Sequence, residues 1–552
     1  MEQGYGTPPV WGGCGNRRPP RPDIFTVTIS TTSPSQPDPA PAPTVGRARR
    51  GTARRRPDRQ SNRLLKRLHF FAGIICAPLI LVASVTGLLY AFAPTIEKVV
   101  YHDMLTVSAP ENPADAEPVS DLVRTARAEH PDLPLAGVRL GKPDETTRVL
   151  FSDPDLPEST LRAVFLDPYT GEVKGDTTQY GSSASLPFRQ WLSDGHRKLW
   201  LGENGRLYSE TAASWLGVLA VGGVAMWWTR NRSVKAMLRT GGKGRTRTMR
   251  RHGATGTVVA VGMVFLTVTG LTWSSVAGTN IGEWRSQLDW VKPTVTTELA
   301  GMPDPTPDAG AAGAAGAGPH AGHEGHQMAA GASTVSGLNA GAVDRVAATA
   351  RAEFSAPLTI TPPTAEGAAW SAAEDRAAFR FTLDAVAVDW ATGKVTDRVD
   401  FSSWPFFAKV SEWLINLHMG LLFGWVNQLV LGLLAAAIIA MVGFGYAMWW
   451  KRRPRTGGAV VAGAPPRAGW GRPTRGTLLL AAVLVGYSVI APLFGITCAV
   501  FLVVSAGYDL VRRARGAAVT AGPGMSAGPG VPGGPGASPS NGTASTSGSR
   551  AR

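Results

Sequence analysis

Five long apolar runs constrain this chain more than any other feature of its sequence. Each is close to, or longer than, the ~20 residues that an α-helix needs to cross a bilayer. They lie at residues 70–96, 212–228, 253–273, 419–450 and 476–506. A soluble enzyme cannot accommodate so many such runs, so the sequence predicts a polytopic α-helical membrane protein.

Charge alternates along the chain in step with these runs. The net charge is +15, and four segments hold 34 of the 55 Lys and Arg residues but only 5 of the 40 acidic ones. These basic segments are residues 1–67, 229–252, 451–475 and 507–552. The pattern follows the positive-inside rule. It predicts a multi-pass protein of the cytoplasmic membrane with both termini cytoplasmic, and it gives no reason to expect a nucleic-acid partner.

These signals divide the chain into tails, spans, loops and two extracytoplasmic modules. Both flanks of the last apolar run are basic and Pro492 lies inside it, which favours a hairpin of two helices over one kinked helix. The predicted segments are a disordered basic tail (1–60), helix 1 (61–96), module 1 (97–210), helix 2 (211–230), a basic loop (231–251), helix 3 (252–275), module 2 (276–418, with a His/Ala/Gly-rich insert at 303–341), helix 4 (419–450), a second basic loop (451–475), a C-terminal hairpin (476–512) and a disordered tail (513–552).

The chain contains an internal repeat. His69 and Gly73 recur as His252 and Gly256, and the pair Thr86-Gly87 recurs as Thr269-Gly270 with the same spacing. Further along, VFLDPYTGEV (164–173) matches VAVDWATGKV (386–395), WLSDGHRKLWLG (191–202) matches WLINLHMGLLFG (413–424), and Met-Trp-Trp occurs at both 226–228 and 448–450. The sequence therefore predicts a four-helix core built from two parallel repeats.

Each module is predicted to be a small α+β unit. Val119–Glu129 and Ala342–Glu353 have helical periodicity, and apolar alternation precedes a DxxTG motif in both halves. That motif suits a hairpin turn in which Gly171 or Gly393 has a positive φ.

Four of the nine histidines occupy repeat-related positions. His69 and His252 begin the two outward helices and form the inner pair. His196 and His418 precede the two inward helices and form the outer pair, predicted on short interfacial helices or loops. Facing imidazoles across a helix bundle are the axial arrangement of a six-coordinate haem iron, whereas a single interfacial histidine is usually only a packing residue.

The glycines near these histidines have two interpretations. Gly73 and Gly256, and on the outer side Gly420 and Gly424, would let a flat macrocycle approach the backbone. The same residues also suit close helix–helix packing, and the sequence does not decide between the two.

Two other segments have distinctive compositions. Gly202-Glu203-Asn204-Gly205 is predicted to break any helix that continues from His196. The insert carries His320, His323 and His326, which could bind a transition metal, although a solvated linker fits its composition better. Walker, Rossmann and serine-hydrolase motifs are absent, which argues against a nucleotide or flavin domain within the chain.

The motifs RLHFFAG…TGLLY, HRKLWLGENGR…MWW, RRHGATG…TGL and LHMGLLFG…MWWKRR resemble the PepSY-associated transmembrane helix family over about residues 61–512. Helix 3 starts with RRHGATG where the family more usually has a DLHR-type start. Some members are iron-regulated membrane proteins and siderophore reductases. The resemblance implies two PepSY-like modules and two b-type haems, with His69, His252, His196 and His418 as the axial ligands.

The resemblance also implies a function. The implied function is a relay that carries electrons from an unidentified cytoplasmic donor to a ferric siderophore, or another iron chelate, outside the membrane. One alternative is a non-enzymatic PepSY-type binding or regulatory protein of the cell envelope, and another is a metal or proton carrier. The sequence identifies neither the chelate nor the oligomeric state.

Overall fold

The computed structural model describes residues 59–111, 116–299, 340–365, 367–452 and 473–520. The histidine-rich insert with His320, His323 and His326 lies outside the described residues, as do the N-terminal tail to residue 58 and the tail from residue 521.

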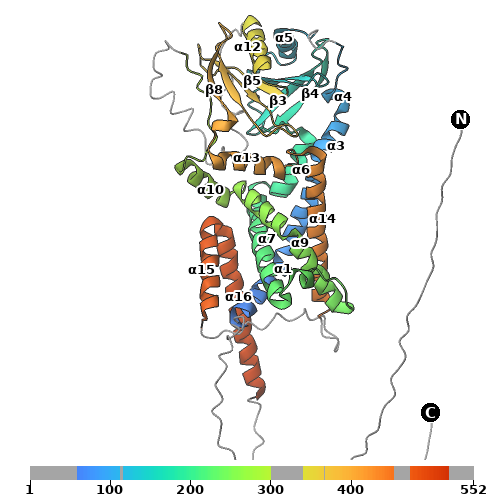
Figure 1. The fold of residues 1–552 in the computed structure, drawn as a ribbon, viewed down its shortest axis with the longest axis vertical. Coiled ribbons are helices and arrows are strands. Elements are labelled where there is room, and N and C mark those ends of the chain that lie inside the picture. The colour runs from blue at the N-terminus through green and yellow to red at the C-terminus, as the bar shows by residue number, and fades with distance from the viewer. Residues whose placement is uncertain (1–58, 112–115, 300–339, 366, 453–472, 521–552) are drawn as a thin grey trace, which may run out of the picture. The chain divides into compact units, whose positions relative to one another are not determined.

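The first half of the chain runs from helices through a set of strands and back to helices (Figure 1). Its elements are α1 (Arg59–Ile75), α2 (Ala77–Ala91), α3 (Ala93–Val100), α4 (His102–Leu105), α5 (Val119–Glu129), β1 (Leu135–Leu140), β2 (Thr147–Phe151), β3 (Thr160–Leu166), β4 (Val173–Tyr180), α6 (Pro187–Lys198), α7 (Gly202–Asn231) and α8 (Val234–Met237).

The second half has a similar order, and two further helices follow it. Its elements are α9 (Gly244–Thr272), α10 (Val276–Gln287), α12 (Ala340–Glu353), β5 (Leu358–Thr361), β6 (Trp370–Glu374), β7 (Ala385–Val388), β8 (Val395–Val399), the 3₁₀ turn η2 (Phe401–Ser403), α13 (Phe406–His418) and α14 (Gly424–Trp450), followed by α15 (Arg475–Ile490) and α16 (Pro492–Thr520).

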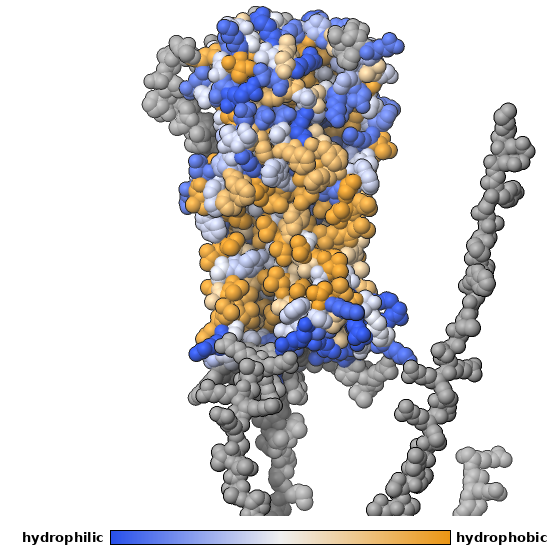
Figure 2. Space-filling model, in the orientation of Figure 1, coloured by the Kyte–Doolittle hydropathy of each residue, from blue (hydrophilic) through white to orange (hydrophobic). Residues whose placement is uncertain are grey.

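The helices include enough apolar length to make this a multi-pass membrane protein. In the described residues, α7, α9, α14 and the Pro492–Val511 part of α16 are each long and apolar enough to span a bilayer, and the bent pair α1–α2 makes a fifth candidate. Figure 2 shows a hydrophobic band over these helices, with hydrophilic residues over the sheet on one side and at the opposite helix ends on the other. The prediction of a polytopic membrane protein is confirmed.

The first span differs from the single helix predicted over residues 61–96. It breaks at Cys76 into α1 and α2, which meet at a bend of 58°. Pro78 has no N–H to donate to the carbonyl of Ile74 four residues earlier. The Tyr446 hydroxyl of α14 donates to that carbonyl instead, at 3.0 Å. The bend therefore leaves no orphaned acceptor at this position, which an apolar environment would penalise.

The strands form one sheet, not two separate modules. All eight are antiparallel in the order β4-β3-β2-β1-β5-β6-β7-β8, so the half-sheets join edge to edge at β1 and β5. Within that seam Val138 pairs with Ile360. Helices α5 and α12 cover one face, and their apolar sides share a core with residues from both half-sheets, including Leu135 and Val386. The sequence predicts an α+β module in each half but not their joining, in which strand edges left open in each half pair with each other.

The local predictions for the modules are confirmed. The helices α5 and α12 lie where helical periodicity placed them. In the DxxTG turns, Gly171 has φ +69° and Gly393 has φ +71°. Each glycine N–H donates to the carbonyl of the aspartate four residues earlier, Asp167 or Asp389.

The last apolar run forms two packed helices, α15 and α16, with the chain turning at Ala491 before Pro492. A buried ion pair ties this hairpin to the first span. Arg67 on α1 donates to both carboxylate oxygens of Asp509, at 2.9 and 2.8 Å, and to the Ser505 carbonyl at 2.7 Å. Trp215 of α7 adds a hydrogen bond to Thr497.

Candidate functional site

The outer pair, His196 and His418, lies where the sheet-bearing part of the chain meets the helices. His196 is on α6, which follows β4, and His418 ends α13, which follows β8. The centroids of the two rings are 6.4 Å apart. Both side chains are on short helices outside the long spans, as the sequence indicates. The break after His196 falls at residues 199–201, so the prediction that Gly202–Gly205 interrupts the helix is wrong: α7 begins at Gly202.

Threonines at the same repeat position hold both outer imidazoles. Thr86 Oγ1 lies 3.2 Å from Nδ1 of His196, and Thr269 Oγ1 lies 2.6 Å from Nδ1 of His418. Each threonine hydroxyl also donates to the carbonyl four residues earlier in its own helix, at 2.8 Å. Because its proton is used there, the oxygen accepts from the imidazole Nδ1–H, which leaves Nε2 of each histidine with a free lone pair.

Burial also keeps the two outer imidazoles neutral. Burial lowers the pKa of His196 to about 4 and the pKa of His418 to about 3. Both rings are therefore neutral at neutral pH, the form that ligates a metal ion.

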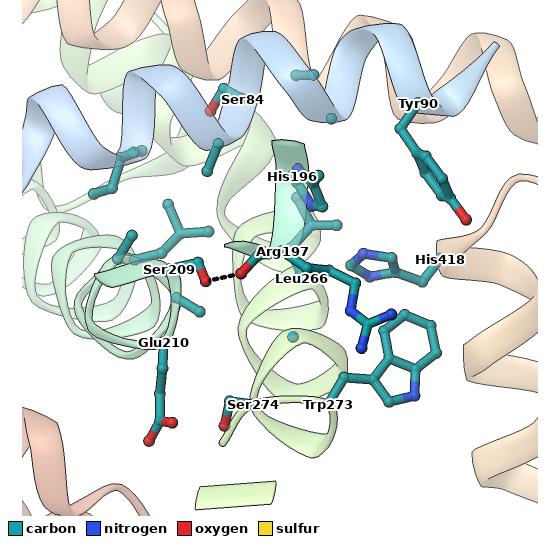
Figure 3. A pocket seen from close by; sticks show the side chains of 18 of the residues that line it. Ser84, Tyr90, His196, Arg197, Ser209, Glu210, Leu266, Trp273, Ser274 and His418 are labelled. Carbon is teal, nitrogen blue, oxygen red and sulfur yellow. Dashed lines mark hydrogen bonds between the residues drawn. The ribbon is translucent and has the colours of Figure 1, made fainter. Parts of the chain in front are cut away.

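A pocket of about 160 Å³ adjoins the outer pair. Figure 3 shows His196, His418, Arg197 and Trp273 converging on one part of this pocket, with Glu210 and Ser274 at the other end. The Trp273 ring lies edge-on to His418, with centroids 5.3 Å apart. Gly87 permits the position of His196, because a Cβ at that glycine would lie 2.9 Å from the imidazole Cε1.

The inner pair, His69 on α1 and His252 on α9, also has ring centroids 6.4 Å apart. Nδ1 of His252 lies 3.0 Å from the Met441 carbonyl of α14 and must donate to it, so its Nε2 is free. Nδ1 of His69 is buried and makes no hydrogen bond to any residue that the structure describes. The Cε1 of His69 is 3.2 Å from the position of a Cβ on Gly223.

The inner pair opens on a larger cavity of about 530 Å³. This volume lies within the range of about 300–1,000 Å³ typical of small-molecule and cofactor sites. Gly73 and Gly256 line the cavity, and a Cβ on Gly73 would meet nothing within 4 Å. Gly73 therefore leaves space in the cavity and does not serve helix–helix contact.

The predicted role of Gly420 and Gly424 at the outer site is not found. These residues have φ of +76° and +55° and form the turn between α13 and α14, outside the residues that line the outer pocket. Their positive φ explains the glycines. Gly87 and Gly270 line that pocket instead.

The two histidine sites are separated by a thin apolar wall. Three residues, Ile80, Leu216 and Ile438, line both cavities, and all three are buried. Along the unbroken helix α9, 17 residues separate His252 from Thr269, the partner of His418, which corresponds to about 25 Å. The three residues that line both cavities are therefore all apolar.

The centroid separations of the two pairs can be compared with those of two imidazoles that share one axial metal. Two imidazoles on one iron have Fe–N bonds of about 2 Å, and each ring centroid lies about 1.1 Å behind its nitrogen, so their centroids should be about 6.2 Å apart. The observed value of 6.4 Å in both pairs agrees with this separation. The inner cavity also has the volume for a macrocycle, whereas the outer pocket is smaller and partly filled by its aromatic and Arg197 side chains.

The remaining histidines in the described ranges do not contribute. His102 is exposed on α4, and His130 pairs with Asp176 at 2.6 Å. No group of three or more His, Cys, Asp or Glu side chains in the described part of the chain could hold a bare metal ion. The sequence did not identify Thr86 and Thr269 as partners of the outer histidines, although both belong to the Thr-Gly motifs of the repeat.

Several apolar helices, an antiparallel sheet and two partly buried histidine pairs define a multi-pass membrane protein with an α+β domain at one end of its helices. The chain belongs to the PepSY-associated TM region family, whose model matches residues 66–452, more than half of the sequence. No curated protein matches it.

Proposed function

We propose that this protein is a transmembrane di-haem electron relay that reduces ferric iron, in a siderophore or another chelate, on the extracytoplasmic side. The observation that carries the proposal is the presence of two imidazole pairs with the same 6.4 Å centroid separation at opposite ends of the helices. The imidazoles of His196, His252 and His418, which are held at Nδ1 and have a free Nε2, are suited to ligate a b-type haem iron.

In this proposal His69 and His252 hold one haem b, and His196 and His418 hold the second. Bound haem would supply one-electron chemistry, since its iron changes valence without ligand exchange. Thr86, Thr269 and the Met441 carbonyl keep three of the imidazoles in the ligating tautomer. The apolar side chains of Ile80, Leu216 and Ile438 exclude water between the sites.

The proposal includes a topology. The inner pair and the basic loops face the cytoplasm, both termini are cytoplasmic, the sheet is outside, and the membrane is the cytoplasmic one. Support comes from the positive-inside distribution of Lys and Arg. The two halves are related by a pseudo-twofold axis: His196 and His418 are 222 residues apart, as are Val138 and Ile360, which pair across the β1–β5 seam.

A visible absorption spectrum of the purified, dithionite-reduced protein tests the proposal first. We expect a b-type haem spectrum with two haems per chain. A protein free of haem after expression with ample haem supply would instead favour the PepSY-type binding or regulatory alternative, in which the histidines only pack.

The relay itself is tested with His418→Ala. Reduction of an external ferric siderophore should fall sharply, while the inner haem stays bound and reducible from the cytoplasmic side. His102→Ala is the matched control, since His102 is exposed and lines neither cavity. Unchanged ferric reduction in a well-expressed His418→Ala protein that lacks the outer haem would refute the relay.

A further inference from the structure

The residues that line the inner cavity are apolar at one end and cationic at the other. Near the wall between the two sites it is lined by apolar side chains such as Ile80 and Met263. At the ends of the helices it is lined by four cationic side chains from four different helical segments, and no Asp or Glu among the described residues lines it. The four are Lys66, Arg230, Arg245 and Arg452.

Two of these cations occupy the same position of the repeat. Arg230 follows Trp227 by three residues near the end of α7, and Arg452 follows Trp449 by three residues just after α14. Residues three apart lie on the same face of a helix. The two tryptophans and the two arginines all line the cavity. Each inward helix therefore presents an indole and then a guanidinium to the cavity that contains the inner pair.

These cations have no carboxylate partner in the part of the chain that the structure describes. No carboxylate oxygen there lies within 4.0 Å of the cationic nitrogens of Lys66, Arg230, Arg245 or Arg452. The contact of Arg452 with Phe70 is of a different kind, since its guanidinium lies 5.8 Å from the centre of an aromatic ring. A concave apolar site with four unneutralised positive charges at one end attracts an amphipathic anion.

We infer that Arg230 and Arg452 bind the two carboxylates of the ligand in the inner cavity, one each, with Lys66 and Arg245 adding positive charge at the rim. Haem b carries two propionates on one edge, so the inference rests on the proposed function and deepens it. The planar guanidinium fork matches a carboxylate with two parallel hydrogen bonds. The propionate edge then faces the basic loops, and the apolar edge faces Ile80 and Met263.

The test compares two ligands that differ only in these carboxylates. Haem-depleted, full-length His418→Ala protein is titrated with haem and with haem dimethyl ester, and binding to the inner pair is followed by the Soret band. We expect free-acid haem to bind at least about tenfold more tightly than the ester, because the ester has no charge to pair with arginine.

The arginine variants assign that preference to residues. In Arg230→Gln/Arg452→Gln the preference for free-acid haem should fall to about twofold or less, and Arg230→Lys/Arg452→Lys should keep an intermediate preference, since charge remains without the fork. Arg232→Gln is the matched control, because Arg232 lies two residues after Arg230, is exposed and does not line the cavity.

The outcomes of these titrations distinguish failure of the carboxylate inference from failure of the proposed function. Equal affinity of the parent protein for the two porphyrins would overturn the inference while leaving the haem proposal intact. If Arg230→Gln/Arg452→Gln kept the full preference for free-acid haem over the ester, the assignment of the carboxylates to Arg230 and Arg452 would be overturned. Failure of both porphyrins to give a bis-imidazole spectrum would refute the proposed function and the inference with it.

Discussion

The hydroxyl oxygen of Thr269 lies 2.6 Å from Nδ1 of His418 and orients the imidazole by accepting a hydrogen bond from its Nδ1–H. Outer-shell partners of this kind typically change metal affinity by about 10–100-fold when removed. Thr269→Val should therefore weaken haem binding at the outer pair by about tenfold and leave the inner pair unaffected. Haem titration of a His69→Ala background, which retains only the outer site, measures the change.

Thr211→Val is the control for this substitution. Thr211 is partly exposed on α7, and its hydroxyl donates to the Leu207 carbonyl of its own helix. Equal haem affinity in the Thr269 and Thr211 variants would show that the threonine does not position the ligand.

The inner pair should account for half of the bound haem. Replacing His69 or His252 by Ala removes one axial ligand, so we expect about one haem per chain in place of two. A pyridine haemochrome assay against protein concentration gives the ratio. Retention of two haems in the double variant would contradict the assignment of both residues.

The topology can be mapped with reporter fusions. Fusions at residues 140 and 370 should report an extracytoplasmic position and one at residue 240 a cytoplasmic position, because the basic loop containing residue 240 should stay inside. Alkaline phosphatase and a fluorescent protein active only in the cytoplasm provide complementary readouts. An extracytoplasmic signal from residue 240 would overturn the arrangement.

The ion pair between Arg67 and Asp509 should hold the C-terminal hairpin against α1. Arg67 is 2% exposed and its carboxylate partner 18%. Removing one member of a buried pair leaves the other uncompensated, at a cost of about 3–5 kcal/mol in the free energy of unfolding. Arg67→Ala should show this loss in a detergent unfolding titration, and Arg67→Ala/Asp509→Ala should recover part of it. Arg63→Ala, an exposed site on the same helix, should have little effect.

Lys292 should make the stability of the fold depend on pH. Burial lowers the pKa of this lysine from its ordinary 10.5 to about 8, although Glu412 opposes the shift. Between these two values the unfolded chain binds more protons than the folded one, so stability rises with pH across that range. Lys292→Met should raise the melting temperature at neutral pH and remove this rise. If Lys394→Met, at an exposed position, flattened the profile equally, Lys292 would not be its source.

The sequence predicted the parts of this protein that depend on periodicity and repetition. Apolar length identified the spans, and equal spacing in the two halves was enough to single out His69, His196, His252 and His418 from the other histidines. The turn glycines Gly171 and Gly393 were also predictable, because a DxxTG motif requires a positive φ at one fixed position.

Other features depend on contacts between distant segments. The bend at Cys76 arises from Pro78 but persists because Tyr446, 372 residues after Ile74, satisfies the freed carbonyl. The threonine contacts of the outer pair depend on how α6 and α13 dock on α2 and α9. Local spacing cannot specify such docking, which is why the sequence left two interpretations open for Gly420 and Gly424.

The pairing of β1 with β5 also governs how the halves of this chain can be exchanged. Residues 181–186 join β4 to α6 and residues 400–405 join β8 to α13, so each outer histidine follows its half-sheet by a short connection. A shift of one residue in the seam moves one half-sheet by about 3.4 Å, more than the two histidines of the proposed outer haem site could tolerate. A chimera that takes one half from a relative must therefore reproduce the register in which Val138 faces Ile360, even if its histidines, threonines and membrane helices are unchanged.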